Sequence, residues 1–352
     1  MRSFMLSAML FALVATPSVR LCAAAETVAH GAHWTELPGS MPMNCFSGAP
    51  GQLPSTAHTR GTVFLARPLD GQGVTLTEWD LALAKVVREA KFGWPETGVQ
   101  VVRAGDTLHL AVASPRVRYA AVNAETLRIA HQVDLGVGDA PILASDGALS
   151  VVSWFQPPNW YAATLDADGR ILGRFHRALT PQTGGPRALQ LVVLNGHAYA
   201  LVGRGDVTHL LKLSPALAVE KDVVHATNDE ASLAIVSGHL VVGSNDGFDE
   251  LSADLDVLGH HRHWSGGDTP LFAADPSGRI VTNYGDVFLN PAQPPVATFP
   301  VAYSADDPMP PLWVGNVPVL LHAYSPTRTV GYIEWMDLSA PDSLPPRPTP
   351  PP

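Results

Sequence analysis

The stretch from Val99 to Leu135, VQVVRAGDTLHLAVASPRVRYAAVNAETLRIAHQVDL, contains four short apolar segments separated by turn residues. A Gly-Asp turn precedes Thr107 to Ala113, where leucine and valine occupy every second position. Tyr119 to Asn123 and Ile129 to Leu135 follow, with a Glu-Thr turn between them. Alternation of apolar residues between tight turns predicts four antiparallel strands in one small sheet.

The same four-strand unit recurs along the chain. The second strand of each unit is expected to open at Thr62, Thr107, Ala148, His197, His239, Arg279 and Val317. These positions are 45, 41, 49, 42, 40 and 38 residues apart. A period near 40 in an all-β pattern indicates a radial or stacked array of sheets.

The two ends of the chain complement each other. The last unit has no outer strand of its own, because only a proline-rich tail follows Met336-Asp337-Leu338. Ala32 to Leu37 is strand-like and belongs to no unit. We therefore expect the N-terminal strand to pair with the last sheet and close a ring, which removes exposed sheet edges.

On these repeats, the chain resembles a seven-bladed β-propeller from about Ala32 to Leu338. It is closest in style to secreted bacterial propellers of the YVTN and quinoprotein-like superfamily. The sequence has no Tyr-Val-Thr-Asn repeat, no Gly-His and Trp-Asp pair in each blade, and no pyrroloquinoline-quinone tryptophan motif, so no subfamily is identified. The resemblance implies an all-β fold of seven four-stranded antiparallel sheets, with an eight-bladed ring or a pair of sandwiches as alternatives. It implies no reaction.

Residues 1–25 read as a signal peptide. Arg2 precedes the apolar run Phe4 to Val14, and Ala23-Ala24-Ala25 offers small residues for cleavage before Glu26. We expect a secreted or periplasmic protein with a propeller at 26–340 and a disordered proline-rich tail at 341–352. No later stretch reads as transmembrane.

Composition limits the partners of the chain. Loss of Arg2 and Arg20 with the signal peptide changes the net charge from −10 to −12. An acidic surface repels phosphate backbones, so we expect no nucleic-acid partner. Cys45 is the one cysteine left after cleavage, so the mature chain has no internal disulfide.

The resemblance implies that the loops from each outer strand to the next inner strand share one face with the loops between second and third strands. It also implies that ligands bind on this face, near the axis. The first loop set carries acids in five of seven units: Glu96, Asp139, Asp229 with Glu230, Asp268, and Asp306 with Asp307. Such acids can bind Ca²⁺, but our first interpretation is that they form turns.

The second loop set is rich in aromatic and charged residues. Its candidate ligand-binding residues are Phe155, Trp160, Arg116, Arg118, Arg204, Tyr284 and Tyr324. In the third unit, four aromatic residues between Trp154 and Tyr161 flank Pro157-Pro158. We expect Trp154 and Tyr161 to pack between blades. For Phe155 and Trp160, core packing and ligand contact are both open.

Met41, Met43 and Cys45 lie within five residues in the long first-unit loop from Gly39 to Gly51. Two thioethers and a thiol are soft ligands suited to Cu(I). The alternative is that they fill apolar space, as free cysteine and methionine usually do.

The chain contains no Gly-x-Ser-x-Gly, His-Glu-x-x-His, phosphate-binding loop or Cys-x-x-Cys. The leading hypothesis is therefore a scaffold that binds a protein or a small-molecule ligand on its axial loop face. One alternative is a divalent-metal-assisted hydrolase, lactonase or lyase at the channel mouth, with Glu96, Asp139, Asp268 and Asp307 as candidate ligands. Another alternative is copper binding through Met41, Met43 and Cys45. The sequence leaves open whether the protein is an enzyme and whether it holds Ca or Cu.

Overall fold

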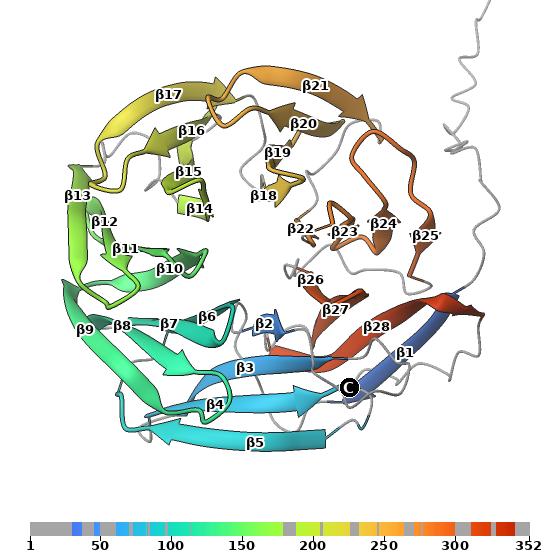
Figure 1. Ribbon diagram of the computed structural model, residues 1–352, viewed down its shortest axis with the longest axis horizontal. Helices are drawn as coiled ribbons and strands as arrows, with labels where there is room; N and C mark the ends of the chain where they lie inside the picture. Colours follow the sequence, from blue (N-terminus) through green and yellow to red (C-terminus); the bar gives the residue numbers. More distant parts are fainter. Residues whose placement is uncertain are drawn as a thin grey trace, which may run out of the picture.

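The computed structural model describes residues 30–36, 46–49, 61–69, 73–81, 83, 85–95, 98–113, 115–178, 188–204, 207–225, 232–244, 246–263, 271–275, 277–299, 311–324 and 329–341. These residues form seven four-stranded antiparallel sheets arranged in a ring, and they contain no helix (Figure 1). The predicted all-β, seven-bladed fold is confirmed.

The first three blades follow the chain from the inside of the ring to its circumference. Blade 1 consists of β2 (Phe46–Ala49), β3 (Thr62–Leu69), β4 (Gly73–Asp80) and β5 (Lys85–Phe92). Blade 2 consists of β6 (Gly98–Ala104), β7 (Thr107–Ala113), β8 (Arg116–Asn123) and β9 (Ile129–Val137). Blade 3 consists of β10 (Asp139–Ser145), β11 (Leu149–Gln156), β12 (Asn159–Asp166) and β13 (Ile171–Ala178).

The next three blades repeat this order. Blade 4 consists of β14 (Ala188–Leu194), β15 (His197–Arg204), β16 (Val207–Leu213) and β17 (Val219–His225). Blade 5 consists of β18 (Leu233–Val236), β19 (His239–Gly243), β20 (Gly247–Leu251) and β21 (Val257–Arg262). Blade 6 consists of β22 (Phe272–Ala274), β23 (Ile280–Thr282), β24 (Asp286–Phe288) and β25 (Ala297–Thr298).

Blade 7 joins the two ends of the described chain. It contains β26 (Leu312–Val314), β27 (Val317–Tyr324), β28 (Thr329–Pro341) and, on its outside, β1 (His30–Glu36). The antiparallel register pairs Trp34 with Glu334 and Glu36 with Tyr332. The N-terminal strand thus supplies the outer strand that the last repeat lacks.

Two expected boundaries need correction. The first-unit loop from Gly39 to Gly51 is not loop throughout, because β2 lies inside it and pairs with β3. Pro341 was expected to begin the tail, but it is the last residue of β28, opposite His30.

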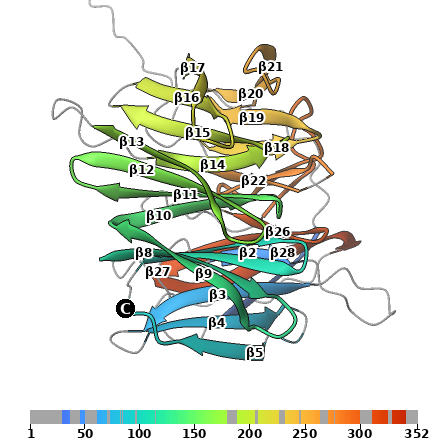
Figure 2. The same ribbon diagram turned by 60° about the vertical axis from the view of Figure 1, so that its left-hand side comes forward.

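The core lies in the seven seams between neighbouring blades. In β3, Val63 and Leu65 pack against blade 7, whereas Phe64 and Ala66 pack against blade 2. Side chains alternate between the two faces of a strand, so each blade contributes to two seams. The oblique view in Figure 2 shows neighbouring sheets face to face.

Strand order fixes two faces of the ring. The hairpins between second and third strands and the connections between blades lie on one face, which we name the loop face. The hairpins between first and second strands and those between third and outer strands lie on the opposite face, the turn face. The turn face carries the tight Gly turns, among them Gly105 and Gly196, whose φ angles of 58° and 73° favour glycine.

Candidate functional site

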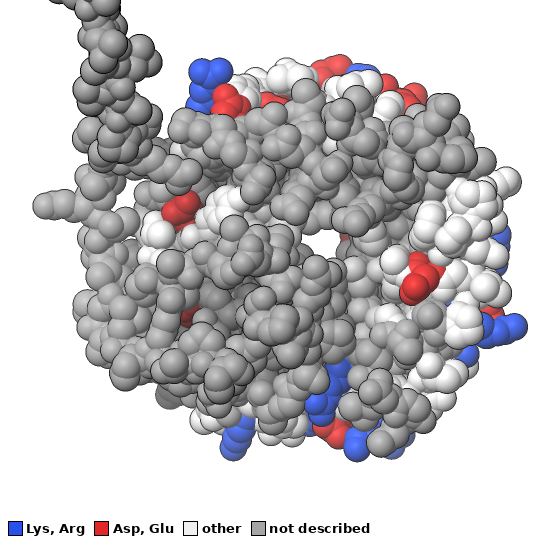
Figure 3. Space-filling view, turned by 180° about the vertical axis from the view of Figure 1, so that it is seen from behind, with Lys and Arg blue, Asp and Glu red and all other residues white. Residues whose placement is uncertain are grey.

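The predicted binding surface is the loop face. Figure 3 views the ring from behind, with the described Lys and Arg side chains in blue and the described Asp and Glu side chains in red. The loop-face hairpins of blades 3 and 6 are described in full, and those of blades 2 and 5 in part.

The blade 3 hairpin is the best-described part of this face. The pairs Phe155–Trp160 and Gln156–Asn159 lie opposite each other, and the turn is Pro157-Pro158, joined by a cis peptide bond. Phe155 also lies opposite Asp139 of the inner strand β10. The topology therefore brings one predicted metal ligand beside one predicted ligand-binding aromatic residue.

The two aromatic residues left open by the sequence differ in burial. Trp160 is only 2 % exposed and packs in the seam between blades 3 and 4, with its ring centroid 5.2 Å from that of Phe175. The prediction of Trp160 as a ligand-contacting residue is wrong, because its indole belongs to the core. Phe155 is half-buried against the same seam and keeps part of its ring at the surface.

Trp154 and Tyr161 pack between blades, as expected. Trp154 is buried in the seam between blades 2 and 3, and its ring stacks on Tyr161 at 5.7 Å. Tyr161 stacks in turn on the exposed His176 of β13 at 6.0 Å. Gly138 lies against these stacked rings, because a Cβ atom at its position would come within 2.3 Å of Trp154 Cδ1.

The two arginines of blade 2 have intramolecular partners. Arg116 forms an ion pair with Asp134 of the outer strand β9. The Arg118 guanidinium lies 5.7 Å from the ring centroid of the buried Trp94. Any ligand that uses these arginines has to compete with these contacts.

Blade 6 brings Tyr284 to the loop face. Its side chain is 37 % exposed in the hairpin between β23 and β24. Next to it, burial raises the pKa of Asp286, whose carboxylate accepts a hydrogen bond from Thr298 at 2.8 Å. Arg204 is the last residue of β15 and Tyr324 the last residue of β27, both at the loop face. Their side chains are not among those that the structure describes.

Of the predicted metal ligands, Asp139 is described. It is exposed, and its Oδ1 accepts a hydrogen bond from the Ala140 backbone at 2.8 Å, which is the role of a turn-forming acid. Met41, Met43, Cys45, Glu96, Asp268 and Asp307 lie outside the described residues. Within the described ranges, no group of three or more His, Cys, Asp or Glu side chains is arranged to hold a metal ion.

The structure also contains a buried polar group that the sequence pattern did not predict. His109 of β7 is 3 % exposed, and its Nδ1 lies 2.6 Å from the Tyr119 hydroxyl and 3.1 Å from Ser150 Oγ of blade 3. Burial and the nearby His131 lower the pKa of His109 to about 4. A histidine in an otherwise apolar strand was the available signal for a neutral, buried imidazole.

Comparison with known proteins supports the fold. The chain matches no known family profile and no curated protein sequence. Solved structures with the same ring include a chain of the mitotic checkpoint complex, at TM-score 0.58 and 11 % identity, covering 94 % of this chain and 99 % of that chain. U3-55K matches at TM-score 0.57 and 10 % identity, covering 88 % and 98 % of the two chains. The Dos1 propeller matches at TM-score 0.54 and 11 % identity, covering 90 % of this chain and 96 % of that chain.

The described part of the chain contains no helix with the length and apolar character needed to cross a membrane.

Proposed function

We propose that the protein is an interaction scaffold that binds a protein partner on its loop face. The observation that carries this proposal is the placement of Phe155 and Tyr284. Both aromatic rings are partly exposed, and both stand in loop-face hairpins, in blades 3 and 6 of one ring. Aromatic side chains on a rigid support are typical anchors of protein interfaces.

The fold is compatible with this role. Seven seams of buried side chains hold the blades, so hairpins far apart in sequence stay at fixed positions on one surface. A partner that contacts blades 3 and 6 together meets a preformed surface and loses less conformational entropy on binding. One similar ring occurs in the mitotic checkpoint complex, which is a protein assembly.

We also propose that the scaffold acts outside the cytoplasm, on the basis of residues 1–25. Cleavage after Ala25 gives a mature chain that starts at Glu26. Intact-mass measurement of the protein from producing cells tests this point, and retention of the first 25 residues would reject it.

Site-specific photocrosslinking tests the binding face. A photoreactive phenylalanine analogue is placed at Phe155 or Tyr284, with Glu125 in a turn-face hairpin of blade 2 as the control position. We expect adducts of one common mass from both loop-face positions and none from Glu125. Adducts from Glu125 alone, or equal adducts from all three positions, would reject the loop face as the interface.

A double replacement, Phe155→Ala with Tyr284→Ala, measures the energetic share of the two rings. The expected result is loss of the adduct-forming partner, with an unchanged melting temperature within a few degrees. Full binding by the folded double variant would remove both rings from the proposed interface.

A further inference from the structure

A row of three side chains recurs in blades 1 to 4, with one residue each on the second, third and outer strands. The rows are Phe64–Glu78–Arg88, His109–Ala121–His131, Val151–Thr164–Gly173 and Tyr199–Lys212–Lys221. Cross-strand neighbours project from the same face of a sheet, and Phe64, Ala121, Val151 and Tyr199 each pack toward the next blade. Each row therefore lies in the seam with the following blade.

Blades 1 and 3 use this row to bond the turn between the third and outer strands of the next blade. Arg88 Nη2 donates to the Ala124 carbonyl at 3.1 Å, and Thr164 Oγ1 donates to the Pro215 carbonyl at 2.5 Å. Ala124 and Pro215 lie at corresponding positions of their turns. The contact is thus a feature of the repeat.

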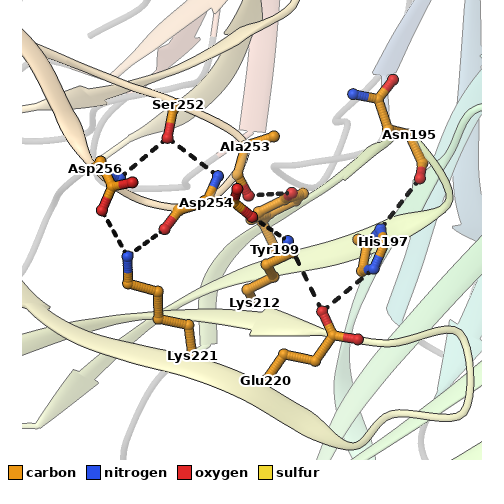
Figure 4. A network of polar contacts seen from close by, with 10 residues as sticks. All are labelled: Asn195, His197, Tyr199, Lys212, Glu220, Lys221, Ser252, Ala253, Asp254 and Asp256. Carbon is orange, nitrogen blue, oxygen red and sulfur yellow. Dashed lines mark hydrogen bonds and ion pairs between the residues drawn. The ribbon is translucent and has the colours of Figure 1, made fainter.

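Blade 4 makes the same contact with blade 5. Figure 4 shows the Tyr199 hydroxyl, which donates to the Ala253 carbonyl at 2.7 Å. In the same row, Lys212 bonds to the Asp254 carboxylate at 2.7 Å, and Lys221 donates to the Asp254 carbonyl. Every polar side chain of this row therefore has a partner in the next blade.

The row of blade 2 is different, because two of its polar atoms have no such partner. His109 is 3 % exposed, and its Nδ1 lies within hydrogen-bond distance of Tyr119 and Ser150. The Nε2 atoms of His109 and His131 are both buried, and neither makes a hydrogen bond with the described residues. Buried polar atoms of native proteins nearly always have a partner, either in the protein or in an ordered water molecule.

The two imidazoles have space between them. Where blade 4 carries the long side chain of Lys212, blade 2 carries Ala121, and the backbones of His109 and His131 lie two strand spacings apart, about 9.6 Å. Burial, and after it the nearby His131, lower the pKa of His109 to about 4, so the two rings are near each other. Blade 3 covers this region, since a Cβ atom at Gly169 would come within 2.7 Å of His131 Nε2.

The chemistry of the two nitrogens favours water over a cation. A neutral imidazole donates from one nitrogen and accepts at the other, and a water molecule can complement either arrangement because it both donates and accepts. A buried water needs about two to four polar partners, whereas a structural zinc ion takes about four protein ligands. Two imidazole nitrogens over an alanine fit the first requirement better.

We propose that one water molecule is bound in the seam between blades 2 and 3, over Ala121, where it bridges Nε2 of His109 and Nε2 of His131. It supplies to this seam the polar contact that direct hydrogen bonds supply to the corresponding rows of blades 1, 3 and 4. The site is independent of the loop-face interface, because the row lies at the turn-face end of the seam.

Two adjacent alanines of β8 provide a matched test. Ala121 faces the two imidazoles, whereas Ala120 faces the apolar seam with blade 1, and each is 1 % exposed. Threonine and valine have nearly the same shape, but only threonine brings a hydroxyl that can take the place of a water. We expect a higher urea midpoint for Ala121→Thr than for Ala121→Val, and the opposite order for Ala120→Thr and Ala120→Val.

A high-resolution crystal structure of the wild type tests the site directly and needs no variant to fold. We expect one density peak within hydrogen-bond distance of both Nε2 atoms, with no anomalous signal. In Ala121→Thr, the threonine hydroxyl should replace this peak.

Three results would overturn the proposal. The first is a higher midpoint for valine than for threonine at both positions. The second is a wild-type map without a peak between the two rings. The third is an anomalous peak at metal-ligand distance from both nitrogens, since the ligand would then be a transition-metal cation.

Discussion

The buried histidine of blade 2 makes the sharpest stability prediction. His109 is 3 % exposed, and its Nδ1 contacts the hydroxyls of Tyr119 and Ser150. Burial and the nearby His131 lower the pKa of His109 from 6.5 to about 4, and the charge of Asp146 opposes the shift only in part. The folded chain therefore keeps this imidazole neutral under conditions in which the unfolded chain protonates it.

The magnitude follows from the two pKa values of His109. Each pKa unit corresponds to about 1.4 kcal/mol, so a drop from 6.5 to about 4 is equivalent to about 3 kcal/mol of pH-dependent stability. This contribution is complete above pH 6.5, falls by about 2 kcal/mol at pH 5, and is exhausted below pH 4. Acidification therefore destabilises the protein through this residue.

Urea unfolding at pH 7 and pH 5, in wild type and His109→Gln, isolates the effect. The variant retains a polar group next to Tyr119 but takes no proton. Between the two pH values, we expect wild type to lose about 2 kcal/mol more free energy of unfolding than the variant does. His176→Gln, at an exposed histidine of blade 3, is the control and should behave as wild type.

Equal losses in wild type and His109→Gln would refute the reasoning, because the proton uptake on unfolding would then occur elsewhere. A difference that appears in His176→Gln as well would point to a surface-charge effect. Subtraction of the variant from wild type removes the contribution of all other titratable groups, which both proteins share.

Three further substitutions test other contacts. Gly138→Ala should destabilise by about 1–3 kcal/mol and change the near-ultraviolet circular dichroism, because the new methyl group would lie 2.3 Å from Trp154 Cδ1. Arg279→Leu leaves the carboxylate of Asp275, 3 % exposed, without its cation, and should cost about 3–5 kcal/mol by urea unfolding. Trp160→Ala should lower the free energy of unfolding by about 3–5 kcal/mol in the same assay. An unchanged free energy would contradict the burial of this indole in the core.

The positions of the strands could be predicted because short-range turn chemistry sets them. The expected openings at Thr62 and Thr107 coincide with the first residues of β3 and β7. Of the seven predicted openings, two differ from the structure: Ala148 and Arg279 each lie one residue before the first residue of β11 and β23. Gly-containing turns determine where a strand begins, and this information lies within a few residues of the boundary.

The contacts between blades could not be predicted in the same way. His225 and Asp249 are in contact, but they belong to different sheets and are separated by most of a repeat. Nothing in the local pattern of β17 distinguishes His225 from an exposed histidine on an outer strand. Its burial depends on how closely blade 5 packs, which is a property of the closed ring.

The blade 3 hairpin shows why the candidate site could be predicted only in part from the sequence. Phe155 and Trp160 lie directly opposite each other, so their side chains project to the same face of the sheet, toward blade 4. The other neighbouring strand of each residue decides the difference. Phe175 of the outer strand β13 covers Trp160, whereas Phe155 lies beside the exposed Asp139 at the start of the inner strand β10. Strand alternation specifies the face of each residue, but burial depends on the neighbouring strand, and for this reason Phe155 stays partly exposed while Trp160 is buried.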